Sequence, residues 1–93
     1  MTAVRVCREG KRLWLSARGH AEGSPEICGA VSVLLQTLAD SAVASGALLY
    51  VCLRDGLGEL CVCRGQEKEF ELTCRALRLL SEDYGDYVSY SER

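Results

Sequence analysis

GHAEGSPEICGAVS, residues 19–32, joins a short strand pattern to the first long apolar segment of the chain. Gly23, Ser24 and Pro25 are turn-forming residues, so the chain is expected to leave the strand in a loop. Ser24 is a favourable N-cap, and Pro25 suits the first helical position because its missing N–H would lack a partner there anyway. The stretch therefore predicts a strand, a connection and a long helix, in that order.

The apolar segment after this connection predicts a central helix from Glu26 to about Ser45. Its large apolar residues recur at helical spacing and are Ile27, Val31, Leu34, Leu35, Leu38 and Ala42. Further apolar residues leave the segment little polar surface, so we expect this helix to be buried. Gly46 is expected to end it.

Period-two patterns predict five short strands around this helix. They are Ala3–Arg8, Arg12–Arg18, Ala47–Arg54, Gly58–Arg64 and Asp86–Tyr90. A second, amphipathic helix is predicted from Gln66 to Asp83, with Phe70, Cys74, Leu77 and Leu80 on one side. The order ββαββα(β) predicts one α+β domain over residues 1–93, with both helices packed on a small, mostly antiparallel sheet.

His20, the only histidine, and Cys28 form a candidate catalytic pair. A thiol is a weak nucleophile until it becomes a thiolate, which a nearby imidazole or a helix N-terminus favours. Cys28 falls in the first helical turn, whose N–H groups lack intrahelical partners and can stabilise a thiolate or an oxyanion. The loop between the two residues is long enough to bring them to hydrogen-bonding separation. Ser32, four residues on, shares the helix face of Cys28.

The alternative for Cys28 is a structural role, because a buried cysteine commonly acts as a small, inert hydrophobic residue. The other cysteines are expected to be buried free thiols and are Cys7, Cys52, Cys61, Cys63 and Cys74. A zinc site needs four ligands, and Cys61-Val62-Cys63 has no second close cysteine pair to join it. We therefore predict no metal and no cofactor. The absence of a Cys-x-x-Cys motif makes a thiol-redox role a third-ranked alternative.

The composition narrows the class of protein. The formal net charge of the 93 residues is -2, and the 11 lysines and arginines are scattered, so nucleic-acid binding is not predicted. The N-terminus lacks the apolar core of a signal peptide, and no segment is expected to reach the 18 or so apolar residues that span a bilayer. We therefore expect a cytoplasmic, globular protein with free thiols and no membrane partner.

GHA at 19–21, followed by ICGAVSVL at 27–34, resembles the signature of the ribosomal-processing cysteine proteases, the Prp family. In those small bacterial endopeptidases, a Gly-His-Ala motif ends a strand and an Asp-Ile-Val-Cys-Ala-Ala-Val-Ser motif begins the central helix. The likeness extends to the order of the remaining elements and a Tyr-Val pair near the end. Two features differ: the loop between histidine and cysteine is several residues shorter here, and Pro25 replaces the usual acidic residue.

The resemblance implies a role for each matching residue. His20 matches the general base, Cys28 the nucleophile, and Ser32 a polar residue that assists the pair. The loop expected to cover the substrate cleft comprises Ala21, Glu22, Gly23 and Ser24. Glu26 is one position away from the family's acidic residue, so no role is transferred to it.

The resemblance also implies a substrate and an assembly. The family removes an N-terminal extension from a large-subunit ribosomal protein, so the expected partner is the N-terminal peptide of that precursor. A homodimer is the expected assembly. The alternative from a different class is a non-catalytic protein-binding module on the same fold, in which the shortened loop no longer forms a substrate cleft.

Overall fold

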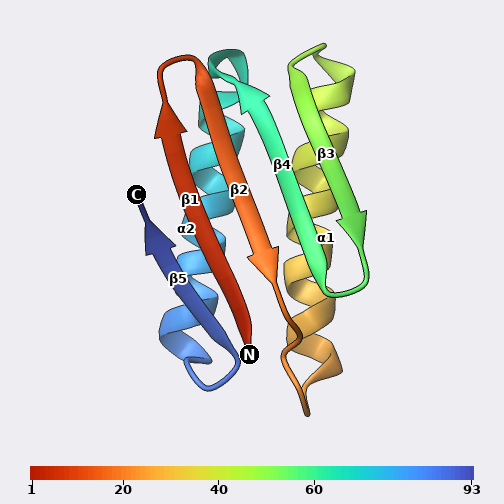
Figure 1. The fold of residues 1–93 in the computed structure, drawn as a ribbon, viewed down its shortest axis with the longest axis vertical. Coiled ribbons are helices and arrows are strands. Elements are labelled where there is room, and N and C mark those ends of the chain that lie inside the picture. Colours follow the sequence, from red (N-terminus) through yellow and green to blue (C-terminus); the bar gives the residue numbers. More distant parts are fainter.

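The alternating strand patterns become one five-stranded sheet in the computed structural model, which describes residues 1–93. The elements are β1 (Thr2–Glu9), β2 (Arg12–Arg18), α1 (Pro25–Ala44), β3 (Leu48–Arg54), β4 (Leu57–Cys63), the 3-10 turn η1 (Arg64–Gln66), α2 (Glu67–Asp83) and β5 (Val88–Glu92). The strands lie in the order β3-β4-β2-β1-β5 (Figure 1), and only the β1–β5 pair is parallel. The predicted α+β fold is confirmed.

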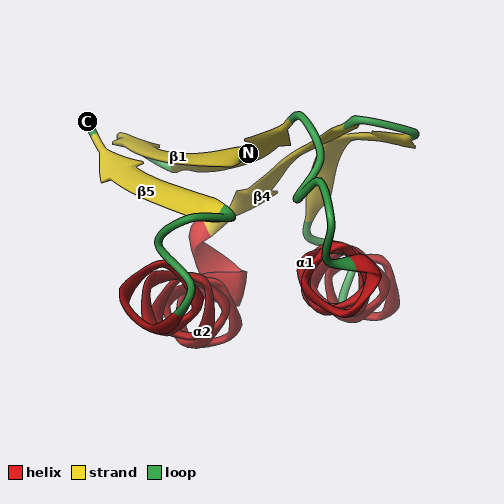
Figure 2. Cartoon of the chain, turned by 90° about the horizontal axis from the view of Figure 1, so that it is seen from below, coloured by secondary structure: helices red, strands yellow, loops and turns green.

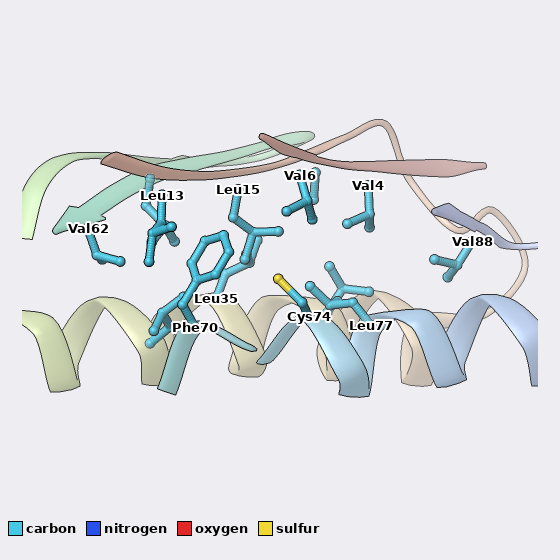
Figure 3. Close-up of a cluster of buried hydrophobic side chains, with 14 of the residues drawn as sticks. Val4, Val6, Leu13, Leu15, Leu35, Val62, Phe70, Cys74, Leu77 and Val88 are labelled. Carbon is cyan, nitrogen blue, oxygen red and sulfur yellow. The ribbon is translucent and has the colours of Figure 1, made fainter. Parts of the chain in front are cut away.

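Both helices pack on the same face of the sheet and leave the opposite face open (Figure 2). Leu13, Leu15 and Ala17 of β2 point into the core, as their alternation predicts. Figure 3 shows Phe70 and Cys74 of α2 beneath the strands in the same layer. The core is therefore a single layer of apolar side chains between sheet and helices.

The expectation that α1 is buried is wrong for much of its surface. Its buried residues are Ile27, Val31, Leu35, Leu38, Ala39 and Ala42, which form the side that meets the core. Val33 is 59% exposed and Val43 62% exposed, because the sheet lies on only one side of the helix.

The expectation that no segment is long and apolar enough to span a membrane is also wrong. By length and composition, the 20 residues of α1 meet that requirement. The core helix of a soluble protein meets it equally well, since apolar composition serves both environments. In this structure α1 packs against the sheet through its buried side.

The ends of α1 follow the predicted capping residues. The Ser24 hydroxyl accepts a hydrogen bond from the Ile27 N–H at 3.4 Å, and Pro25 is the first helical residue. Ser45 is the C-cap, and Gly46 follows it with φ +69°, a left-handed conformation that glycine adopts easily. The predicted start and stop of α1 are confirmed.

Two groups of residues differ from the predictions. The last strand runs two residues later than expected, from Val88 to Glu92, because parallel pairing with β1 continues to the partners Val6 and Glu92. Cys61 and Cys74 are buried, as expected. The other thiols predicted to be buried are half-buried and are Cys7, Cys52 and Cys63. The register places these three on the open face, where no helix covers them; Cys61 lies on the same face but is 1% exposed.

Arg8 connects three elements at the edge of the core. Its guanidinium donates two hydrogen bonds to Glu71 of α2, at 2.8 and 2.7 Å, and a third to Glu92 of β5. Its Cζ lies 5.8 Å from the centroid of the Phe70 ring. Hydrogen bonding to Arg8 lowers the pKa of Glu71, whereas burial raises the pKa of the neighbouring Cys74 thiol to about 11. The ion pairs therefore fasten α2 and β5 to β1.

Replacing Arg8 with methionine should lower the free energy of unfolding at pH 7 by about 1 kcal/mol, a discounted value because Glu71 is 42% exposed. The pKa of Glu71 is lowered in the folded state, so its contribution is present above its ordinary pKa of 4.5 and is lost as pH falls through the lowered value. The free energies of unfolding of the wild-type protein and the variant, measured with urea from pH 7 to pH 3, should therefore converge as pH falls.

The matched control is Arg78→Met, which removes an exposed arginine 3.8 Å from Glu82 on the surface of α2. Surface pairs of this spacing contribute only about 0.3–0.5 kcal/mol. Equal losses in the Arg8 and Arg78 variants would contradict the fastening role of Arg8.

Candidate active site

The three predicted catalytic residues line one pocket of about 380 Å³. His20 follows β2, whereas Cys28 and Ser32 lie on the first two turns of α1, and all three line this pocket. The turn between β3 and β4 forms part of its wall. This turn lies near His20 because β4 pairs antiparallel with β2, so that β4 starts beside the end of β2 (Figure 1). The structure thus brings the predicted residues together from separate elements.

The sulfur of Cys28 is held by the backbone of Ala21. The Ala21 N–H donates a hydrogen bond to Cys28 Sγ at 3.1 Å, and the thiol lies 3.7 Å from the Ala21 carbonyl, to which it can donate. Ala21 is 2% exposed, so this backbone donor is fixed in the protein interior. The two contacts with the Ala21 backbone therefore fix the position of the sulfur.

The helix N-terminus does not offer the free donors that were predicted. The Ile27 N–H donates to the Ser24 hydroxyl at 3.4 Å, and the Cys28 N–H donates to the Ser24 carbonyl at 3.2 Å. Pro25 has no N–H, so the Glu26 N–H is the one first-turn amide that makes no hydrogen bond within the chain. The expectation of several unpartnered first-turn donors is therefore wrong, because the Ser24 cap occupies two of them.

The segment expected to cover the cleft is a tight turn. The Ser24 N–H donates to the Ala21 carbonyl at 3.0 Å, and Gly23 has φ +85°, as the third residue of a type II turn requires. Glu22 and Gly23 are exposed, and none of residues 21–24 is among those that line the pocket. The shortened connection therefore lies beside the pocket, with Ala21 as its fixed end.

His20 rests on the turn between β3 and β4. Its imidazole Nε2 is 3.7 Å from a carboxylate oxygen of Asp55, and its side chain is 51% exposed. The Gly19 N–H donates to the Gly56 carbonyl at 3.0 Å, which ties the histidine loop to this turn. No hydrogen bond joins His20 to Cys28, although both line the same pocket. The two side chains therefore share the pocket without a direct hydrogen bond between them.

Ser32 has a different partner from the one its predicted role needs. Its hydroxyl accepts a hydrogen bond from the Gln36 side chain at 3.2 Å, one turn further along α1. Ser32 is exposed and lines the pocket, but it makes no hydrogen bond with Cys28 or His20. It is positioned to meet a molecule in the pocket rather than the thiol itself.

Sequence reasoning missed the residues that the β3–β4 turn contributes to the pocket. Asp55-Gly56 is typical of a hairpin turn, and this signal is local to the turn. Its proximity to His20 depends on which strand lies beside β2, and nothing local to residues 55–56 specifies that neighbour. The structure shows no group of three or more His, Cys, Asp or Glu side chains that could hold a metal ion.

Comparison with known proteins identifies the fold. The chain matches no protein-family model and no curated protein sequence. It resembles the crystal structure of the essential ribosomal processing protease Prp from S. aureus, in complex with a covalently linked product peptide, with a TM-score of 0.75, 16% identity and full coverage of both chains. It also resembles SMU.848 from Streptococcus mutans, with a TM-score of 0.73, 21% identity, and 99% and 96% of the two chains covered.

These likenesses extend over the whole chain, so the fold expected from the sequence signature is confirmed at the level of structure. At these identities they show the fold alone, and the roles of His20, Cys28 and Ser32 stay predictions.

Replacing Gly56 with alanine should displace the His20 ring, because the added Cβ would lie 3.0 Å from Nε2. Gly10→Ala is the matched control: Gly10 also has a positive φ in a hairpin turn, but an added Cβ there meets nothing within 4 Å. Both variants should lose about 1–2 kcal/mol of stability from the left-handed backbone. Only Gly56→Ala should shift the ring resonances of His20, which NMR observes without overlap because the chain has one histidine. Unchanged resonances in folded Gly56→Ala would contradict the observed packing.

Proposed function

We propose that this protein is a cysteine endopeptidase of the Prp type. The observation that carries the proposal is that His20 and Cys28, from different elements, line one pocket in a chain whose whole length has the fold of the S. aureus Prp protease. The amide of buried Ala21 supports the same assignment, since it is aimed at the sulfur that would attack the substrate.

The chemistry follows from the positions of these groups. His20 takes the proton of the Cys28 thiol, and the thiolate attacks the carbonyl carbon of the scissile peptide bond. The resulting imidazolium returns the proton to the leaving amine, so that a thioester and a new N-terminus form. Water, deprotonated by His20, then attacks the thioester and releases the new carboxylate and the thiol. Backbone N–H groups near Cys28 would hold the oxyanion, and that of Glu26 makes no hydrogen bond within the chain.

The proposed substrate is the N-terminal extension of a large-subunit ribosomal protein precursor, as the resemblance implies. The peptide would lie along the open pocket, with Ser32 at its wall and the exposed Glu22 and Gly23 of the neighbouring turn beside it. We further propose a cytoplasmic homodimer of this single domain. The open face of the sheet is available for such contacts. Tyr50 is 44% exposed, and its ring centroid lies 5.8 Å from that of Trp14.

The second candidate function is a non-catalytic protein-binding module on the same fold. The missing hydrogen bond between His20 and Cys28 and the short turn at residues 21–24 favour it. In that case Cys28 would be a structural thiol, and the pocket would hold a peptide without cleaving it.

Replacing Cys28 with alanine should abolish cleavage of a peptide spanning the precursor's extension junction, while leaving the circular-dichroism spectrum and melting temperature nearly unchanged. Cys63→Ala is the matched control, because Cys63 is a half-buried thiol that does not line the pocket. The Cys63→Ala variant should cleave the peptide at the wild-type rate. Ser32→Ala should lose less activity than Cys28→Ala, since the hydroxyl is not consumed in bond making. Cleavage by a folded Cys28 variant would favour the binding module.

Replacing His20 with alanine should lower the cleavage rate by about 10²–10⁴-fold, because the general base and acid are removed together. Alkylation of Cys28 by iodoacetamide, followed by mass spectrometry of the Cys28 peptide, should slow by a smaller factor. The Ala21 N–H still supports the thiolate in this variant. If both rates stay at the wild-type level in a folded His20 variant, the Cys-His mechanism is wrong.

A further inference from the structure

The turn between β3 and β4 presents a carboxylate to the imidazole of His20. Asp55 Oδ1 lies 3.7 Å from His20 Nε2, and Asp55 is the one acidic side chain within ion-pair distance of this ring. The two residues are 35 positions apart, so the contact exists only because β4 pairs with β2. It is therefore a feature of the folded site rather than of the local sequence.

The orientation of the ring follows from the same turn. An ideal Cβ on Gly56 would lie 3.0 Å from His20 Nε2 but 3.7 Å from both ring carbons that flank it. The Nε2 edge of the ring thus faces residues 55 and 56, and Nδ1 lies on the other side of the ring. The Gly19 N–H, bonded to the Gly56 carbonyl at 3.0 Å, holds the backbone before His20 in this position.

We propose that Asp55 is a positioning residue for His20: its carboxylate holds the proton on Nε2, so that Nδ1 is the nitrogen that exchanges a proton with Cys28. The role in proton exchange rests on the proposed cysteine-protease function, whereas the Asp55–His20 contact does not. A neutral imidazole carries its proton on one nitrogen, and a carboxylate beside that nitrogen selects the tautomer. When the ring takes up the thiol proton, the same carboxylate faces a cation and stabilises it.

The exposure of the pair sets the expected size of its effect. Asp55 is 99% exposed and His20 51% exposed, so water and salt screen the interaction. At 3.7 Å the contact is longer than a direct hydrogen bond. The unpacked Asp55 side chain can shorten it by rotation. We therefore expect a several-fold contribution to rate, far below the effect of removing His20 itself.

The first test is ring-nitrogen NMR of uniformly ¹⁵N-labelled protein, in which His20 gives the only histidine signals. In its neutral form, the ring of the wild-type protein should show the Nε2–H tautomer. Asp55→Ala should lower the Nε2–H fraction toward that of a free histidine ring, and Asp55→Glu should restore it in part, because glutamate returns the carboxylate. Alanine is used rather than asparagine because an Asn-Gly turn deamidates and regenerates the carboxylate. An unchanged tautomer in Asp55→Ala, or the Nδ1–H tautomer in the wild-type protein, would overturn the proposal.

The second test measures reaction rates with a matched control. Asp40→Ala removes the same charge from an exposed site on α1, 12 residues from Cys28 and about 18 Å along the helix. Asp55→Ala should slow both peptide cleavage and Cys28 alkylation several-fold relative to Asp40→Ala, with KM unchanged. In 1 M NaCl the gap should close, since salt of that concentration screens exposed charges beyond about 3 Å. Equal rates in the two variants would overturn the proposal.

The two tests separate this proposal from the proposed function. If wild-type protein cleaves the precursor peptide and the tautomer does not respond to Asp55, the protease assignment stands and the positioning role fails. If wild-type protein cleaves nothing, the protease assignment fails. The tautomer and alkylation results then still decide whether Asp55 orients His20. Should Asp55→Ala unfold, the tautomer of the wild-type ring still tests the proposal, since the Nδ1–H tautomer would overturn it.

Discussion

The hydrogen bond from the Ala21 N–H to Cys28 Sγ connects the two parts of the chain from which the site is built. Ala21 follows β2 and is buried, whereas Cys28 lies on the first turn of α1. The bond therefore fixes where the helix starts relative to the sheet. The four-residue turn between them is closed by a second hydrogen bond, from the Ser24 N–H to the Ala21 carbonyl, and leaves little freedom in the connection.

The histidine side of the pocket depends on a different backbone contact. Gly19 bonds to Gly56, and Thr2 Oγ1 donates to the Gly19 carbonyl at 3.4 Å. Gly19 has φ +89°, and a Cβ there would lie 2.5 Å from the Met1 carbonyl oxygen, so only glycine fits. The N-terminus, the histidine loop and the β3–β4 turn are thereby packed against one another. The imidazole is placed by three segments that are distant in sequence.

The signals that predicted the fold correctly are local ones. The alternation of Leu13 and Leu15 with Trp14 and Ser16 indicated that one side of β2 enters the core, and Ser24-Pro25 indicated where α1 begins. The incorrect predictions concern partners. The exposure of Val33 and Val43 depends on how much of α1 the sheet covers, and the extent of β5 depends on the length of β1. Neither the covered surface of α1 nor the length of β5 can be read from the sequence of that segment alone.

The sequence by itself determined the element order, the apolar faces, the capping of α1 and the identity of the candidate pair, His20 and Cys28. These follow from periodicity, capping chemistry and a recognisable signature, all of which act over a few residues. The tertiary structure alone decided that an amide of Ala21, rather than the free helix N-terminus, holds the sulfur, and that Asp55 faces the imidazole. The physical reason is that donors and charges act over only a few ångströms, so their partners are chosen by strand order and by which N–H groups the Ser24 cap leaves unused.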